Sequence, residues 1–123
     1  MDEHFFSPEL VMKHQRKIDL TPEQRETIKT AAQTAQATFT DVQWQLSDEM
    51  ETMKELVKEN EVDEQRVLDQ LETILNLERE IKRTHLTLMV HIKNTLTPKQ
   101  QVSLKINREW DEQGINQNGS WPW

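Results

Sequence analysis

The sequence predicts an all-α protein, built as four helices around a long antiparallel helical hairpin. Three observations support this fold class. Helix-favouring residues dominate, and the 123 residues include only 2 glycines and 4 prolines. Apolar residues recur at alternating spacings of four and three over two long segments, as in helices that pack along a seam. The pentapeptide LTPxQ occurs at residues 20–24 and again at residues 96–100, and the two copies bracket those segments.

The composition limits the function classes. The net charge is −7 and the hydrophobic fraction is 34%, below the value of about 45% that is usual for a compact globule. A thin helical protein that completes its core by oligomerising fits this shortage. Eight acidic residues against Lys54 and Lys58 give residues 48–64 a local charge of −6. We expect this segment to be the solvated end of the hairpin, and the acidic balance argues against nucleic-acid binding.

Targeting and membrane signals are weak. No segment approaches the run of about 18 apolar residues that a membrane-spanning helix needs. The chain has no cysteine, so disulfide and thiol chemistry are excluded. The first residues, MDEHFF, are acidic where a signal peptide is basic. We therefore expect either a cytoplasmic protein or a protein whose leader or anchor is absent from this chain.

The first helix is expected to begin at Pro8, with Ser7 as its N-cap, and to run to about Lys17. One stripe of this helix carries Val11, His14 and Ile18.

Each LTPxQ copy has the pattern of a capping box. The Thr hydroxyl can accept a hydrogen bond from the Gln backbone N–H, and the Gln side chain can accept one from the Thr backbone N–H. Proline fits the first helical position and prevents the preceding helix from continuing. The copies therefore predict two corners of the fold, where the caps touch no ligand. The capping residues are Thr21, Pro22 and Gln24 at the first corner and Thr97, Pro98 and Gln100 at the second.

Two long helices are expected between the corners. The first spans residues 22–58, and its seam consists of Ile28, Ala32, Ala35, Phe39, Val42, Leu46, Glu49, Met53 and Leu56. A turn over KENEVDEQ follows, with Asp63 as the next N-cap. The second seam consists of Val67, Leu71, Ile74, Glu78, Ile81, His85, Leu88 and Ile92. If the two long helices pack antiparallel, the numbers of facing residues are expected to sum to about 124. This register would place Phe39 opposite His85.

A shorter fourth helix should end before Gly114, with an apolar face marked by Val102, Ile106 and Trp110. The chain then divides into a helical domain, residues 1–113, and an irregular tail, residues 114–123. Trp121 and Trp123 in this tail could dock on the body or on a partner.

The sequence contains no pattern of a nucleophile with its base, no phosphate-binding loop and no dinucleotide fingerprint. We expect no enzymatic activity and no required cofactor. His85 and Met89 lie four residues apart, so imidazole nitrogen and thioether sulfur could bind a divalent metal from one helix face. His14 could approach this pair if the first helix folds onto the hairpin. The alternative is that His85 packs in the seam and Met89 fills the core.

The second candidate site is an apolar surface for other protein chains. Methionine and tryptophan side chains adapt their contacts to varied partners. Alternatively, the same methionines fill gaps in a core or a dimer seam. The methionines concerned are Met12, Met50, Met53 and Met89.

With two LT-x-x-Q corners flanking a helical hairpin, the chain resembles the LTxxQ family of bacterial envelope proteins. This family includes CpxP-like and Spy-like chaperones and ZraP-like and CnrX-like metal sensors. The resemblance covers roughly residues 7–110, including ELVMKHQ before the first corner and HIKNTLTPKQQ around the second. It implies a hooked four-helix protomer that forms a dimer in the periplasm.

For a metal sensor, the resemblance implies ligands from three helices. His85 and Met89 match the H-x-x-x-M pattern of the third helix. His14 stands alone on the first helix, where the sensor pattern has two histidines, and Glu26 is the candidate carboxylate of the second. The candidate metals are zinc, nickel and cobalt.

We therefore expect a non-enzymatic periplasmic protein of envelope stress or heavy-metal resistance. Its homodimer would hold unfolded client proteins, or a membrane sensor or anti-sigma partner, in a helical cradle. It would neither bind nucleic acid nor insert this segment into a membrane. A metal sensor is the alternative function, and a purely structural helical dimer is the third.

Overall fold

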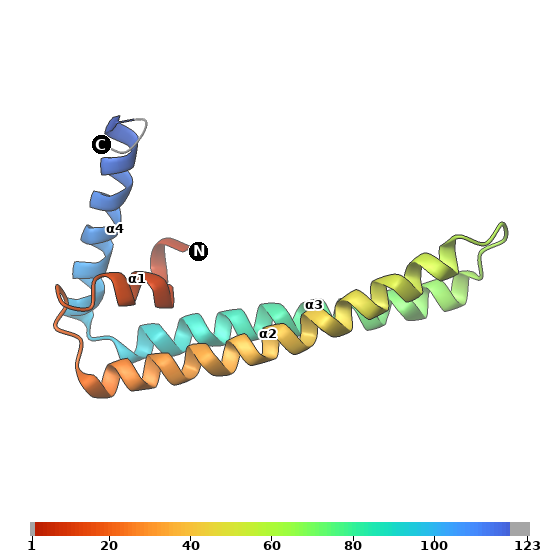
Figure 1. The fold of residues 1–123 in the computed structure, drawn as a ribbon, viewed down its shortest axis with the longest axis horizontal. Coiled ribbons are helices and arrows are strands. Elements are labelled where there is room, and N and C mark those ends of the chain that lie inside the picture. Colours follow the sequence, from red (N-terminus) through yellow and green to blue (C-terminus); the bar gives the residue numbers. More distant parts are fainter. Residues whose placement is uncertain (1, 119–123) are drawn as a thin grey trace. The chain divides into compact units, whose positions relative to one another are not determined.

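The computed structural model describes the backbone of residues 2–118 and the side chains of residues 3–112. A short 3-10 helix, Asp2–His4, precedes four α-helices. No strand occurs within residues 2–118, so the predicted all-α class is confirmed. Figure 1 shows α2 and α3 as a long antiparallel pair. The helices are α1 (Pro8–Lys13), α2 (Pro22–Val57), α3 (Glu64–Thr95) and α4 (Pro98–Asn118).

Two helix ends differ from the sequence prediction. α1 ends at Lys13 because the chain turns from His14 onward, and Asp19 adopts the left-handed region (φ 53°) just before the first corner. Aspartate tolerates that conformation better than most residues. α4 continues past Gly114 to Asn118, since one glycine weakens a helix by only about 1 kcal/mol relative to alanine.

The irregular tail was predicted over residues 114–123, and its two tryptophans, Trp121 and Trp123, lie outside the described residues. The chain forms two compact units, and each is described by itself. Unit 1 comprises Met1–Ala32 with Leu88–Trp123, and unit 2 comprises Gln33–Thr87.

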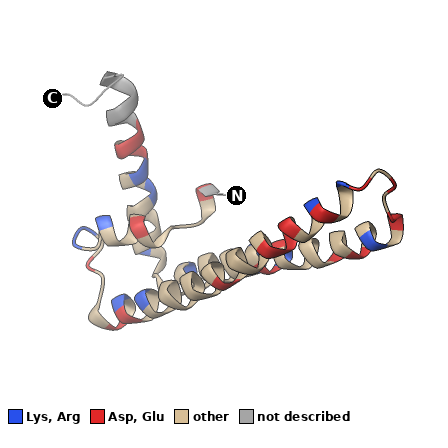
Figure 2. Ribbon diagram, turned by 45° about the vertical axis from the view of Figure 1, so that its right-hand side comes forward, with Lys and Arg blue, Asp and Glu red and all other residues tan. Residues whose placement is uncertain are grey.

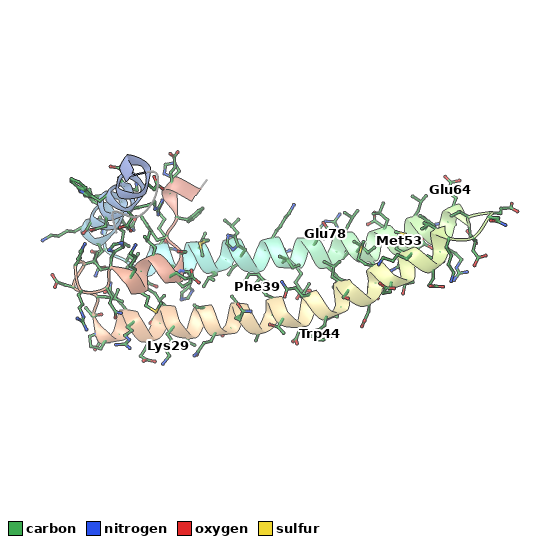
Figure 3. All side chains as sticks on the ribbon, turned by 45° about the horizontal axis from the view of Figure 1, so that its top comes forward. Lys29, Phe39, Trp44, Met53, Glu64 and Glu78 are labelled. Atoms are coloured by element: carbon green, nitrogen blue, oxygen red, sulfur yellow. The ribbon has the colours of Figure 1, made fainter. Side chains whose placement is uncertain are left out.

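In unit 2, the α2 side of the hairpin follows the predicted seam. Phe39 points into the space between the two helices, whereas Trp44 lies on the side of α2 turned away from α3 (Figure 3). Every predicted α2 seam residue is buried or half-buried along the whole helix. The side chains of unit 2 that are fully buried are Ala35, Val42 and Ile74.

The predicted α3 seam is wrong at alternate positions. Leu71, Glu78 and His85 are exposed. Their seam positions are taken by the preceding residues, so the inward positions run 67, 70, 74, 77, 81 and 84, of which 74 is buried and the others are half-buried. Sequence patterning overlooked this register because Gln70 and Thr84 are polar.

The pairing register is also different from the predicted one. Gln70 Nε2 donates to the backbone oxygen of Glu49 at 2.7 Å and to Glu49 Oε2 at 2.6 Å. In unit 1, Gln24 Nε2 donates to the backbone oxygen of Thr95. The residue numbers sum to 119 in both pairs, so the predicted sum of about 124 was wrong by roughly one helical turn. Polar pairs that bridge α2 and α3 fix this register.

The far end of the hairpin is acidic, as predicted. Asp and Glu residues, red in Figure 2, are frequent toward the turn between α2 and α3. Asp63 Oδ1 accepts a hydrogen bond from the Arg66 backbone N–H at 3.2 Å, so Asp63 is the N-cap of α3.

In unit 1, α4 packs with a face other than the apolar stripe that marks the helix in the sequence. Val102, Ile106 and Trp110 are exposed. The face turned inward carries one fully buried apolar residue among polar side chains that find hydrogen-bond partners. Its members are Gln100, Leu104, Asn107, Arg108 and Asp111. The neighbouring segments thus offer polar partners to the inward face, and the apolar stripe is left exposed.

Candidate functional site

Both LTPxQ corners contain a reciprocal capping box. Gln24 N donates to Thr21 Oγ1 at 3.1 Å, and Thr21 N donates to Gln24 Oε1 at 3.0 Å. At the second corner, Gln100 N donates to Thr97 Oγ1 at 3.2 Å, and Thr97 N donates to Gln100 Oε1 at 2.9 Å. Pro22 and Pro98 are the first residues of α2 and α4. These bonds satisfy N–H groups that a helix start leaves without intrahelical partners.

The two boxes are also joined to each other through their glutamines. Gln24 Nε2 donates to Gln100 Oε1 at 2.8 Å, and Gln100 Nε2 donates to Gln24 Oε1 at 2.9 Å. Each amide therefore donates to the other and accepts from it. Residues 76 positions apart in the sequence form one cyclic amide pair.

Each glutamine uses its remaining donor on the chain that precedes the opposite corner. Gln24 Nε2 donates to the Thr95 backbone oxygen at 3.0 Å, and Gln100 Nε2 donates to the Ile18 backbone oxygen at 3.2 Å. With its cap and its partner amide, each side chain makes two donor and two acceptor contacts, which is the full capacity of a carboxamide. A carboxylate could not replace it, because it would have no N–H to donate.

A cluster of ionisable side chains connects α1 to α4. Lys13 Nζ and His14 Nε2 each lie 3.0 Å from Asp111 Oδ2. Because a carboxylate only accepts, His14 Nε2 carries the proton of this bond. The His14 side chain is 4% exposed, whereas that of Asp111 is 33% exposed. The cluster is thus buried on the histidine side and open to solvent on the carboxylate side.

The electrostatics of the cluster favour an ionised carboxylate. Burial alone would raise the pKa of Asp111, but the hydrogen bonds and charges of Lys13 and His14 outweigh this effect and lower it below its ordinary value. Asp111 therefore acts as an anion that attracts the end of α1 to α4.

Aromatic residues fix the segment before α1. Phe6 is fully buried, and the Arg108 guanidinium lies 5.2 Å from its ring centroid. Arg108 also donates to the Phe5 backbone oxygen, and Lys93 Nζ lies 5.6 Å from the Phe5 ring centroid. These cation–π contacts attach the N-terminal segment to α3 and α4 within unit 1.

The predicted metal ligands lie in different environments. His14 and Met89 are buried, whereas Glu26 and His85 are exposed. Among the side chains of residues 3–112, no three His, Cys, Asp or Glu residues converge to hold a metal ion. A buried histidine nitrogen does meet a carboxylate oxygen at His14 and Asp111. A complete ligand set for a metal is therefore not assembled within the described part of the chain, and the four-residue set stays a prediction.

A comparison with models of protein families shows the family to which the chain belongs. A family model described as heavy-metal resistance matches residues 4–103. The chain belongs to the heavy-metal-resistance family. The match includes both LTPxQ corners but only the first turns of α4, up to residue 103, and it confirms the resemblance to LTxxQ proteins. Searches of curated proteins and of solved structures gave no significant match.

Several residues whose contacts hold unit 1 together were missed in the sequence analysis. Phe6, Arg108 and Asp111 were not singled out. Phe6 follows an acidic start without periodicity, and Asp111 has ordinary neighbours in sequence. The one available signal was the stripe from Gln100 through Leu104 to Asp111, whose spacings of four and seven place these residues on one helix face.

We predict that Gln100→Glu destabilises the protein by about 2–3 kcal/mol at pH 7, because two donors to buried acceptors are lost. Urea unfolding followed by circular dichroism measures this change. Gln45→Glu, which makes the same charge change at an exposed position of α2, should change stability by less than about 0.5 kcal/mol. Equal effects of the two substitutions would contradict the role of the amide pair.

Asp111 should contribute to stability at neutral pH but not in acid. Its folded-state pKa lies below the ordinary value of 3.8, so its contribution is present above that value and disappears as pH falls through the folded-state pKa. Wild type should therefore be more stable than Asp111→Asn above pH of about 5, and the difference should shrink toward pH of about 2. Thermal unfolding over this range measures it. Glu112→Gln is the exposed control, and a wild-type advantage over Asp111→Asn that does not depend on pH would contradict the prediction.

Proposed function

We propose that this member of the heavy-metal-resistance family is a non-enzymatic periplasmic binding protein that holds apolar segments of unfolded proteins during envelope or heavy-metal stress. The family match supports a role in heavy-metal resistance. Within residues 2–118, no helix is both long and apolar enough to span a bilayer. A signalling partner, either a membrane sensor or an anti-sigma protein, would use the same kind of surface.

The observation that carries this proposal is the apolar surface of the hairpin in unit 2. A helix pair alone buries only one stripe of each helix, and the remaining apolar side chains are left in contact with water. Trp44 is the most exposed of them, at 72%. The others are Met50, Val57, Val62, Leu68, Leu71 and Leu86. Flexible methionine and large tryptophan side chains fit a surface that accepts varied apolar partners.

The acidic end of the hairpin adds a preference among clients. Residues 48–64 carry a local charge of −6, and complementary charge speeds association and discriminates among partners more than it adds affinity. Basic unfolded segments should therefore associate faster than acidic ones, and the difference should decrease with added salt.

The direct test is suppression of aggregation of a denatured client, at stoichiometric ratio and without ATP. We expect wild type to suppress aggregation and Trp44→Gln to bind client about tenfold more weakly, since exposed tryptophans often dominate such contacts. Val102→Gln removes a comparably exposed apolar side chain, 58%, from α4 in unit 1 and serves as the control. If wild type leaves aggregation unchanged, the chaperone function is wrong.

Metal sensing is the second candidate function. It is supported by the family description and by the buried His14, whose Nε2 lies 3.0 Å from a carboxylate oxygen of Asp111. Imidazole nitrogen and carboxylate oxygen are ordinary ligands of zinc, nickel and cobalt. A metal bound by both side chains would replace the proton that His14 Nε2 donates to Asp111. It would recruit further donors from the predicted set, Glu26, His85 and Met89.

Calorimetric titration with zinc, nickel and cobalt tests this candidate. A sensor predicts micromolar binding that His14→Ala and His85→Ala each weaken by at least about tenfold, because each removes one ligand. His91→Ala removes an exposed histidine of α3 outside the predicted set and should leave binding unchanged. Absence of binding by wild type would eliminate metal sensing and leave the chaperone proposal intact.

A further inference from the structure

One side of the hairpin in unit 2 carries a group of apolar residues near the turn. This apolar flank is formed by Met50, Val57, Leu68, Leu71 and Leu75. The first four are 39–49% exposed, and Leu75 is half-buried. Each member comes directly after an inward position of its helix, which is 49 or 56 on α2 and 67, 70 or 74 on α3.

Helix geometry places these residues on the same side of the hairpin. One step along an α-helix turns the side chain by about 100°, always in the same direction when the helix is viewed from its start. Because α2 and α3 run antiparallel, the residue after an inward position lies on the same side of the pair in both helices.

The opposite side of the same part of the hairpin is polar. It consists of the residues that come directly before the inward positions, and these are exposed polar or charged side chains. On α2 they include Asp48, Thr52 and Glu55, and on α3 they include Arg66, Asp69 and Thr73. The exposed apolar residues near the turn are therefore not scattered, and a contiguous patch of this kind marks an interaction site.

Acidic residues border the apolar flank. Glu64 and Glu78 are exposed and lie seven residues before and after Leu71, so they share its side of α3. The lysine on this side of α2, Lys54, is already paired with Glu51 at 3.0 Å. A partner that is complementary to this side must therefore combine apolar side chains with positive charge.

We infer that the apolar flank is the docking site for a basic amphipathic helix of another protein. Such a helix carries apolar side chains on one stripe and Lys or Arg beside it. Packed along the flank, the stripe covers the exposed apolar residues of α2 and α3 together, and the helix pair becomes a three-helix unit. Glu64 and Glu78 are separated by about 21 Å along α3, which matches a partner helix of about 14 residues with basic side chains near both ends.

Charge and geometry favour this partner over other occupants of the flank. A second copy of the chain would bring its own segment of charge −6, residues 48–64, against the first, and like charges repel. The same segment repels anionic phospholipid head groups. An extended segment turns alternate side chains to opposite sides, so it buries fewer of its apolar side chains against the flank than a helix does.

This inference deepens the client-binding proposal by naming one class of partner, and it rests on that proposal for its purpose. Trp44 lies on the side of α2 turned away from α3, outside the apolar flank (Figure 3). Trp44→Gln should therefore weaken the binding of unfolded clients and leave the binding of an amphipathic helix unchanged. Failure of the client-binding proposal and failure of this inference can thus be told apart.

The test uses a fluorescent synthetic peptide of about 14 residues, made of Leu and Lys with Leu at spacings of three and four. Fluorescence anisotropy measures its affinity, and circular dichroism measures the helix that it gains on binding. We expect wild type to bind this peptide at least about tenfold more tightly than Leu71→Gln does. Leu86→Gln removes a leucine of α3 that is 45% exposed and outside the flank, and it should bind like wild type.

Two further peptides separate charge from pattern. A scrambled Leu/Lys peptide without an apolar stripe, and a Leu/Glu peptide with the original pattern, should each bind at least about tenfold more weakly than the first peptide. Equal binding of the scrambled peptide, or equal binding by Leu71→Gln and wild type, would overturn the docking site. Self-association or phospholipid-vesicle binding of wild type that Leu71→Gln abolishes would also overturn it, because the flank would then belong to a second copy or to lipid.

Discussion

Gln24 and Gln100 form the interaction on which the arrangement of unit 1 depends. Their side-chain amides donate to each other, and each also closes its own capping box and caps a backbone carbonyl before the opposite corner. Four chain segments are therefore tied at one point: the turn after α1, the start of α2, the end of α3 and the start of α4. Gln100 is only 8% exposed, so its bonds form with little competition from water.

The direction in which α4 presents its side chains follows from these bonds. Once Gln100 faces inward, residues on the same stripe must face inward too, including Leu104 and Asp111. The Asp111 carboxylate then reaches Lys13 and His14 on α1. The apolar residues Ile106 and Trp110, on the other side of the helix, are left exposed to solvent.

Sequence patterns correctly predicted the features that depend on residues close together in the chain. The capping boxes, the N-cap at Asp63, the seam of α2 and the length of the hairpin are all encoded within a few turns of chain. The α3 register was predicted wrongly and the packed face of α4 was not predicted, because Gln70 and Gln100 occupy inward positions through polar partners that only the fold supplies. The amide pair joins residues 76 positions apart, and no periodicity signals that contact. Of the predicted metal ligands, the burial of His14 on the α1 stripe was foreseeable, whereas its partner Asp111 was not.

The role of the amide pair is tested most directly by a double-mutant cycle of Gln24→Ala and Gln100→Ala. Urea unfolding measures the free energy of unfolding of each variant. If the two amides bind each other as described, the double variant should be more stable than the sum of the single changes implies, by a coupling free energy of about 1–3 kcal/mol. Additive losses, with coupling below about 0.3 kcal/mol, would show that the two corners are independent caps and would contradict the central role of the amide pair.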